Sequence, residues 1–396
     1  ETVVDLWGGF ADEACRRPWT RDSIVNVYSI TKTMTALTAL WLADRGELDF
    51  AAPVARYWPE FAANGKVGIT VAQLMSHSAG LSGWHPAISG EDFYDWDKAT
   101  STLAAQAPLW EPGTASGYHV YTFGFLIGEV IRRITGRTLG TVFREEIASP
   151  LNVDFWIGLP ASEDHRVADL VPFLPSSAAT GVEMTTIQKI TFSDTRTDVP
   201  STRTRAWRGA EIPAVNGHGN ARSIAAIQTI LATGGVANGQ RIMSEAGCRR
   251  ALEVQIDGPD LVMRGISVRF GLGYGLPSPI LSLVPPNPNT LFWSGGGGAF
   301  EGGAGGRRIE QIAFQIDDGA VADHGGVEHR RVAEENLLDL DRVDVLAAGD
   351  DHVLLAIGQI EEAVFIEIAD VAGAEPVAEE GGRGLLGRSE ERRVGK

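Results

Sequence analysis

VYSITKTMTAL, residues 27–37, predicts a strand end that runs directly into a helix, with Ser29 at the entry and Lys32 three positions later. On a helix, positions i and i+3 lie on one face, about one turn or roughly 5 Å apart. The helix N-terminus also turns free N–H groups and a positive dipole end toward Ser29. An amine that can take the hydroxyl proton, beside N–H groups that can receive an oxyanion, suits a nucleophilic serine.

The same S-x-x-K pattern also has a plain structural interpretation. A serine at a helix entry often caps the helix, and a lysine one turn later often lies in solvent. The motif by itself therefore does not identify an enzyme, and other parts of the chain have to decide between the two interpretations.

Composition restricts the function classes. The chain has 396 residues, of which 44% are hydrophobic and 21% charged, and its net charge is −17. This composition is typical of a globular protein with two or three domains. The negative charge disfavours nucleic acid and anionic membrane as partners, and no apolar run reaches the roughly 18 residues of a membrane span. The sequence leaves the oligomeric state open.

Cysteine usage bears on cofactors and location. Cys15 and Cys248 form neither a disulfide framework nor a zinc site, so we expect no metal and no cofactor. Few cysteines fit a reducing compartment, which predicts a cytoplasmic protein. The chain begins at Glu1 rather than at Met, which keeps a removed leader and a periplasmic or secreted location open.

Hydrophobic periodicity and Gly/Pro punctuation predict the elements. The predicted helices are 31–45, 71–76, 100–107, 123–135, 139–148 and 221–233, and the predicted strands are 2–10, 24–28, 154–159, 270–276, 291–293, 309–316, 353–357 and 363–368. Residues 161–210 lack periodicity and predict loops. The glycine-dense segment 295–306 predicts turns and close backbone approach rather than a phosphate site, because no G-x-x-x-x-G-K-[ST] surrounds it.

Three further motifs follow the serine in order: LMSHSAGL at residues 74–81, WEPG at residues 110–113 before a loop that carries Tyr118, and WSG at residues 293–295. With S-I-T-K, this order resembles the serine β-lactamase and penicillin-binding-protein superfamily. It is most similar to the family VIII carboxylesterases of this superfamily, which are nearest to the class C β-lactamases. The resemblance covers about residues 1–300 and implies an α+β fold, in which an antiparallel sheet flanked by helices meets a mainly helical domain at the active site.

The resemblance implies roles for three residues. Ser29 would be the nucleophile and Lys32 its proton partner, and Tyr118 matches the tyrosine of the second motif, Y-x-N or Y-S-N. The oxyanion hole would consist of the N–H groups of Ser29 and Gly296. The implied reaction is hydrolysis of short to medium acyl esters through an acyl-enzyme, with weak β-lactam hydrolysis left open.

Substrate-binding residues follow from the same comparison. Trp293, Ser294 and Gly295 match the third motif, which is K-T-G in lactamases and often W-x-G in the esterases. Val120 stands where lactamases have Asn, and Trp293 replaces the lysine that would meet a β-lactam carboxylate; both changes favour neutral esters. His119 would orient Tyr118 at the substrate or make a structural hydrogen bond.

The motif order also divides the chain. Residues 1–50 and 222–320 are expected to form the sheet domain, and residues 51–221 the mainly helical domain. Residues 321–396 carry eighteen acidic and eight basic residues and form an atypical acidic tail, whose composition after residue 371 is typical of disorder.

Two other functions stay open at this stage. One is an α/β-hydrolase with Ser78 as nucleophile, although S-H-S-A-G at residues 76–80 lacks the first glycine of G-x-S-x-G. The other is a non-catalytic penicillin-recognising or interaction module with the same fold. Covalent labelling separates Ser29 from Ser78, and ester hydrolysis separates an enzyme from a module.

Overall fold

The structure is a computed structural model, which describes residues 5–171, 183–193, 199–278 and 289–296, and the backbone of strands at 300–304, 311–314, 353–355 and 364–366. The chain forms two compact units. One is Gly8–Ala320. The other joins Glu1–Trp7 to Val321–Lys396 and contains the antiparallel hairpin of β11 (Val353–Leu355) and β12 (Val364–Ile366).

Helix α1 (Thr31–Asp44) is the central element of the larger unit. Every residue from Thr31 to Leu42 is buried, so the helix is covered on all sides. Around it pack α4 (Thr122–Thr135), α5 (Leu139–Phe143) and α10 (Glu245–Arg249). This burial fixes the position of the residues at its N-terminus.

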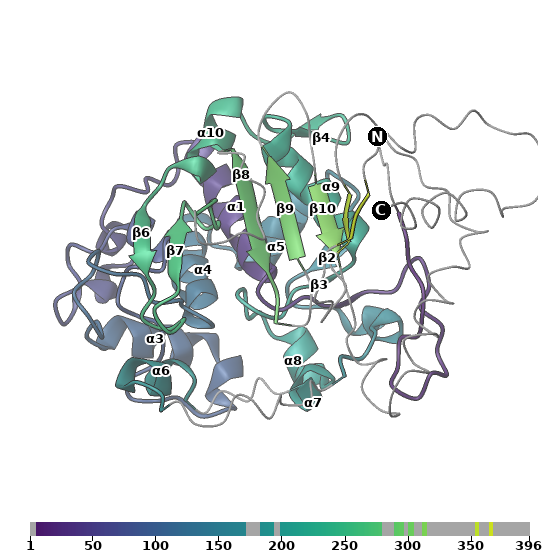
Figure 1. Cartoon of the computed structure of the whole chain (residues 1–396). Coiled ribbons are helices and arrows are strands. Elements are labelled where there is room, and N and C mark those ends of the chain that lie inside the picture. The colour runs from purple at the N-terminus through teal and green to yellow at the C-terminus, as the bar shows by residue number, and fades with distance from the viewer. Residues whose placement is uncertain are drawn as a thin grey trace, which may run out of the picture. The chain divides into compact units, whose positions relative to one another are not determined.

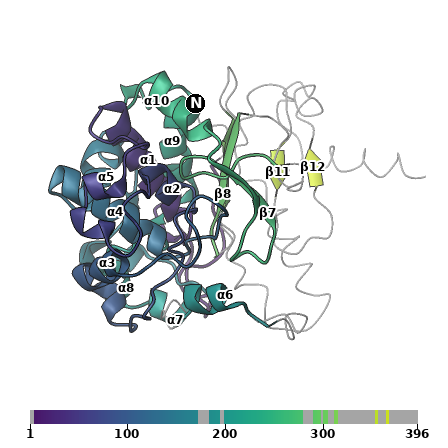
Figure 2. The ribbon, with the colours of Figure 1, turned by 90° about the vertical axis from the view of Figure 1, so that its left-hand side faces the viewer.

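A three-stranded antiparallel sheet lies beside α1 (Figure 1). Its order is β10 (Gln311–Phe314), β9 (Phe300–Ala304), β8 (Thr290–Ser294). Helix α9 (Ala221–Ala232) packs against β9 and β10. Figure 2 shows α1, α9 and α10 on one side of β8. A Cβ added to Gly296, two residues beyond β8, would lie 3.9 Å from the ring of Tyr28, so the end of β8 lies near the N-terminal end of α1.

Two smaller strand groups complete the surroundings of α1. The hairpin of β6 (Ile256–Pro259) and β7 (Ser267–Phe270) connects to β8 through bridges from Gly275 to Phe270 and to Phe292. A second sheet has the order β1 (Val25–Asn26), β3 (His218–Gly219), β2 (Phe155–Trp156). The chain enters α1 from β1, so this sheet sets the position of the turn between them.

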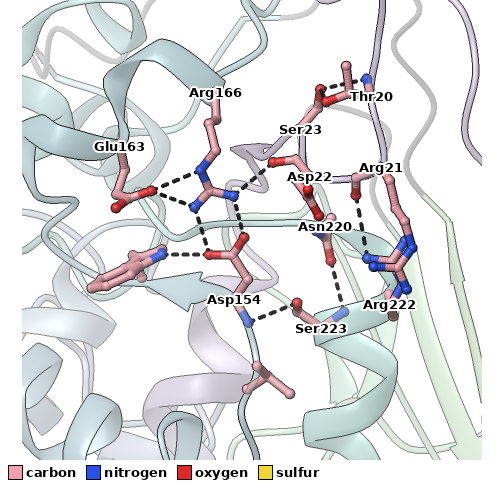
Figure 3. Close-up of polar contacts among 12 residues, drawn as sticks. Thr20, Arg21, Asp22, Ser23, Asp154, Glu163, Arg166, Asn220, Arg222 and Ser223 are labelled. Carbon is pink, nitrogen blue, oxygen red and sulfur yellow. Dashed lines mark hydrogen bonds and ion pairs between the residues drawn. The ribbon is translucent and has the colours of Figure 1, made fainter.

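Arg166 fastens the segment before β1 (Figure 3). Its guanidinium donates to Asp154 Oδ2 at 2.5 Å, to Glu163 Oε2 at 2.7 Å and to the carbonyl of Asp22 at 2.8 Å. Asp154 N in turn donates to Ser223 Oγ at the start of α9, at 3.1 Å. Three chain segments are therefore joined at one cation.

The remaining elements are short. They are α2 (Val71–Met75), α3 (Trp96–Ala105), a π-helix (Arg144–Ala148), α6 (Thr186–Thr191), α7 (Val199–Thr202), α8 (Arg205–Gly209), β4 (Val236–Ala237), β5 (Gln240–Arg241), and 3-10 helices at Val54–Arg56, Pro59–Ala62, Asp92–Tyr94, Ala161–Arg166 and Arg250–Leu252. Nowhere in the described ranges does a helix have both the length and the apolar character that a bilayer crossing requires.

All six predicted helices are confirmed, with ends that coincide with the prediction or differ from it by at most five residues. The predicted strand at 2–10 is wrong over its described part, where only Phe10 forms a bridge, to Pro18. The predicted strand at 270–276 is also wrong, because the chain turns back after Phe270. The domain boundaries stay a prediction, and the predicted disorder after residue 371 lies outside the described residues.

The sequence did not predict β3, β4, β5, β6 or β9, and it placed only the last residue of β7 in a strand. Strand β9 matters most among these for the main sheet. The glycine-dense segment 295–306 contains β9, the middle strand of the main sheet. Glycine has low strand propensity, so the segment gives no local signal. The segment forms a strand because it pairs with a neighbouring strand on each side, with Phe292 and Ile312 opposite Gly302.

Candidate active site

Ser29 lies half-buried in the turn between β1 and α1. The preceding residue, Tyr28, has φ of +44°, a left-handed conformation that is unusual for a tyrosine. Thr31 holds the turn: its hydroxyl donates to the Tyr28 carbonyl at 2.5 Å and accepts from Gly217 N at 2.8 Å. The backbone that carries Ser29 is therefore held in one conformation by these hydrogen bonds.

Lys32 is fully buried beneath the serine. Its Nζ donates to Ser29 Oγ at 3.0 Å, to the Val120 carbonyl at 2.7 Å and to the Ala214 carbonyl at 3.0 Å. Burial holds the pKa of Lys32 well below its usual value. A neutral amine has two N–H donors and one lone pair. When the two carbonyls take the N–H groups, the lone pair is left for the Ser29 hydroxyl.

A glycine in α4 allows the Ala214 carbonyl to reach Lys32. A Cβ on Gly124 would lie 2.5 Å from Ala214 N and 2.5 Å from the carbonyl carbon of Pro213. Only glycine permits this approach of the 213–214 backbone to the helix. The neighbouring Pro213 carbonyl accepts from the Thr35 hydroxyl at 2.6 Å, which fastens the segment to α1.

Tyr118 lies next to both residues. Lys32 Nζ lies 4.7 Å from the centroid of its ring. Burial raises the pKa of Tyr118 above its usual value, and hydrogen bonding from Ser29 and from Trp293 opposes this rise. The phenol is therefore neutral near pH 7. The structure brings Ser29, Lys32 and Tyr118 together, although 86 positions separate Lys32 from Tyr118 in the sequence.

The two residues after Tyr118 face inward. His119 is fully buried; its Nδ1 donates to the Gly117 carbonyl at 2.6 Å and its Nε2 accepts from Leu81 N at 3.2 Å. Both ring nitrogens are thus engaged by main chain, which fits the structural alternative for His119 and leaves neither nitrogen for a substrate. Val120 meets the site through its carbonyl, which accepts from Lys32.

The end of β8 forms the other wall. Trp293 is 5% exposed and stacks on His77, with ring centroids 5.7 Å apart. Ser294 is exposed and Gly295 half-buried. A Cβ on Gly296 would lie 3.9 Å from the Tyr28 ring, so this exposed glycine flanks the serine turn.

The predicted oxyanion hole consists of two main-chain N–H donors. The N–H groups of Ser29 and Gly296 have no hydrogen-bond acceptor among the residues that the structure describes. An N–H group without an internal acceptor can bind a substrate oxygen.

Ser78 occupies a different environment. It is 3% exposed, its hydroxyl lies 3.0 Å from that of Ser76, and it follows α2 rather than a strand. A nucleophile elbow requires a serine at a sharp strand-to-helix turn with an open hydroxyl. The local structure therefore does not support Ser78 as a nucleophile.

Sequence reasoning missed two residues at the site. His77 Nδ1 accepts from His119 N at 3.1 Å, and Asp260 Oδ1 accepts from Tyr118 N at 3.1 Å. The LMSHSAGL motif contains His77 but gives no sign of its partner. Asp260, in the turn between β6 and β7, lies in no motif. No group of three His, Cys, Asp or Glu residues is placed to hold a metal ion within the described ranges.

Comparisons with known proteins agree on the family. The chain matches the Beta-lactamase family model over residues 1–309. It is 38% identical over 293 residues to the esterase/beta-lactamase LipL of Mycobacterium tuberculosis, which is 70% of this chain and 67% of that protein.

Two solved structures are similar to it. A family VIII carboxylesterase is 42% identical with a TM-score of 0.71, covering 78% of this chain and 83% of that chain. A penicillin-binding protein homolog from Caulobacter crescentus is 38% identical with a TM-score of 0.68, covering 74% and 78%. The predicted resemblance and the predicted α+β fold are confirmed. Since the family model spans most of the chain and includes the serine, lysine and tyrosine that meet at α1, the chain belongs to the Beta-lactamase family.

Proposed function

We propose that this protein is a carboxylesterase that hydrolyses neutral esters through an acyl-enzyme on Ser29. The observation that carries the proposal is the Lys32 amine, which is buried, 3.0 Å from Ser29 Oγ and held by two carbonyls. The similarity to LipL and to a family VIII carboxylesterase supports the same reaction class.

The chemistry follows from the positions of the three side chains. Ser29 Oγ attacks the ester carbonyl carbon while its proton passes to Lys32 Nζ. The oxyanion forms between the N–H groups of Ser29 and Gly296. The C–O bond to the alcohol breaks, and the alcohol leaves with a proton delivered through Tyr118. Water then attacks the acyl-serine by the reverse proton path and releases the carboxylic acid.

Burial makes Lys32 a usable base. A lysine in water titrates near 10.4, and a shift of roughly 3 units, about 4 kcal/mol, makes half of it neutral near pH 7. Tyr118 keeps its proton because burial raises its pKa. We therefore assign the base to Lys32 and the proton relay to the neutral phenol.

The walls of the site favour uncharged substrates. Trp293 presents an indole where a β-lactam carboxylate would need a cation, and Val120 has no side-chain amide where lactamases have Asn. We propose small-molecule esters with short to medium acyl chains as substrates, with Trp293, Ser294 and Gly295 beside the acyl group. On this basis a chromogenic cephalosporin is hydrolysed far more slowly than a neutral ester.

The test is hydrolysis of p-nitrophenyl acetate and butyrate by the wild type and by Ser29→Ala. We expect turnover by the wild type and none above background by Ser29→Ala. A fluorophosphonate probe followed by peptide mapping should label Ser29 and leave Ser78 unlabelled. An inactive but folded wild type would favour the non-catalytic module, and a label on Ser78 would contradict the proposed nucleophile.

A further inference from the structure

The loop that carries Tyr118 is held by an unusual number of main-chain contacts. Three successive N–H groups, those of Gly117, Tyr118 and His119, each donate to a residue outside the loop. Gly117 N donates to the His77 carbonyl at 3.0 Å, Tyr118 N to Asp260 Oδ1 at 3.1 Å, and His119 N to His77 Nδ1 at 3.1 Å. The peptide units on both sides of the tyrosine are therefore fixed.

The two acceptors come from different parts of the fold. His77 follows α2 and has φ of +59°, a left-handed conformation that aims both its carbonyl and its ring at the loop. Asp260 stands after β6, and the next residue, Leu261, donates from its N–H to the Ser116 carbonyl at 2.9 Å. The β6–β7 turn and the end of α2 therefore both hydrogen-bond to the loop that carries Tyr118.

The side chain of Asp260 accepts hydrogen bonds from several main-chain N–H groups. It is fully buried, and its Oδ1 also accepts from Val262 N at 2.9 Å and from Met263 N at 2.8 Å. Its second oxygen, Oδ2, is buried and has no hydrogen-bond partner among the described residues. One oxygen therefore serves three N–H groups, and the other is not needed for the geometry.

We propose that Asp260 and His77 are positioning residues, which hold Tyr118 where its phenol meets Ser29 and Lys32. This inference rests on the proposed function. The ring of His77 adds a contact of its own, edge-on to the Tyr118 ring with centroids 5.0 Å apart. A displacement of about 1 Å at a proton-transfer group can lower a rate by about 100-fold, so loss of either acceptor should lower kcat.

Substitutions at Asp260 can separate position from charge. Asp260→Asn keeps an oxygen at the Oδ1 position and removes the charge, whereas Asp260→Glu keeps the charge and moves the acceptor by one methylene. We expect Asp260→Asn to keep kcat within about fivefold of the wild type and Asp260→Glu to lower kcat by about 100-fold with little change in KM. Asp257, an exposed partner of Arg269 in the same hairpin, provides the matched controls Asp257→Asn and Asp257→Glu.

His77 allows an independent pair. Asn tolerates the left-handed conformation and places its Oδ1 where Nδ1 accepts, so His77→Asn should retain most of kcat. His77→Leu has similar bulk and no acceptor, and it should lose about 100-fold. If Asp260→Glu does not fold, this pair together with Asp260→Asn decides the question.

Rates are expressed per serine labelled by a fluorophosphonate, at a temperature well below each variant's Tm. A merely structural role would lower Tm and leave kcat per labelled serine unchanged, and that result overturns the proposal. It also fails if Asp260→Asn loses as much kcat as Asp260→Glu, because a variant that keeps the acceptor in place would then be as inactive as one that moves it. A wild type without Ser29-dependent turnover would instead overturn the proposed function.

Discussion

At the scale of single residues, the site depends on how Lys32 and Tyr118 are protonated. Burial lowers the pKa of the amine and raises that of the phenol, and both shifts favour the uncharged form of the side chain. In the uncharged state the amine can take the Ser29 proton, and the phenol can pass a proton to the leaving alcohol. With the pKa of lysine in water, the amine would be protonated at pH 7 and could not take that proton.

Removal of either group tests this division of roles. Lys32→Met and Tyr118→Phe should each lower kcat for p-nitrophenyl butyrate by about 10²- to 10⁴-fold, the usual contribution of a general base or acid. Far-UV circular dichroism and Tm should show that the variants are folded. Wild-type turnover in both variants would contradict the mechanism.

The pH profile tests the lysine separately. Lys32 acts as a base only when deprotonated, so activity is lost as the pH falls below its pKa in the folded enzyme. Because burial lowers that pKa, kcat/KM should level off at a pH well below 10.4. A lysine with its ordinary pKa near 10.4 would instead give a rise of tenfold per pH unit that continues almost to pH 10.4, which would contradict the assignment.

At the scale of elements, the approach of the 213–214 backbone to α4 supplies one of the carbonyls that hold Lys32. Gly124 permits this approach, and Gly128, one turn later, instead faces the side chain of Trp96. The two glycines therefore form a matched pair on one helix, with different neighbours.

Gly124→Ala should push the 213–214 backbone away and move the Ala214 carbonyl from Lys32. We expect a loss of about 100-fold in kcat, and a loss of about 1–3 kcal/mol in unfolding free energy that higher helix propensity offsets by about 1 kcal/mol. Gly128→Ala meets the Trp96 ring 2.6 Å away and not the 213–214 backbone, so it should keep near-normal kcat. Ester assays and urea unfolding measure both; equal activities would refute the role of this approach.

At the scale of the whole molecule, buried neutral histidines link folding to pH. His218, in β3, is fully buried; its Nδ1 donates to the Asn216 carbonyl at 2.8 Å, and its Nε2 has no partner among the described residues. Burial lowers the pKa of His218 to about 3. The unfolded chain binds a proton near pH 6.5 and the folded chain only near pH 3, so stability falls as the pH decreases between these values.

His218→Asn keeps a donor to Asn216 and removes the titration. For the wild type, this histidine should cost about 2 kcal/mol of unfolding free energy on going from pH 7 to pH 5. The variant should show a pH dependence smaller by about that amount in urea unfolding at the two pH values. His165→Asn, at an exposed position, serves as the control. An unchanged dependence in His218→Asn would contradict the prediction.

Some features of this protein could be predicted from local sequence patterns, and others could not. The Ser29–Lys32 pair, its helix and the order of the motifs are local patterns, and they predicted the family and the ester hydrolase class that the relatives confirm. Strand β9, which was missed, and the strand at 2–10, which was wrongly predicted, were not decided by local sequence. Whether a segment forms a strand depends on its pairing partner, and a local pattern does not contain that partner.

The sequence by itself determined which side chains carry the proposed chemistry, because i, i+3 spacing and helix entry are properties of a short segment. Only the tertiary structure decided how that chemistry is supported: the carbonyls of Val120 and Ala214 on Lys32, and Asp260 and His77 on the Tyr118 loop. These contacts join positions up to 182 residues apart through main-chain atoms. One partner in each contact is a main-chain atom, which every residue has, so the sequence could not show where the side chains of Lys32, Asp260 and His77 bind.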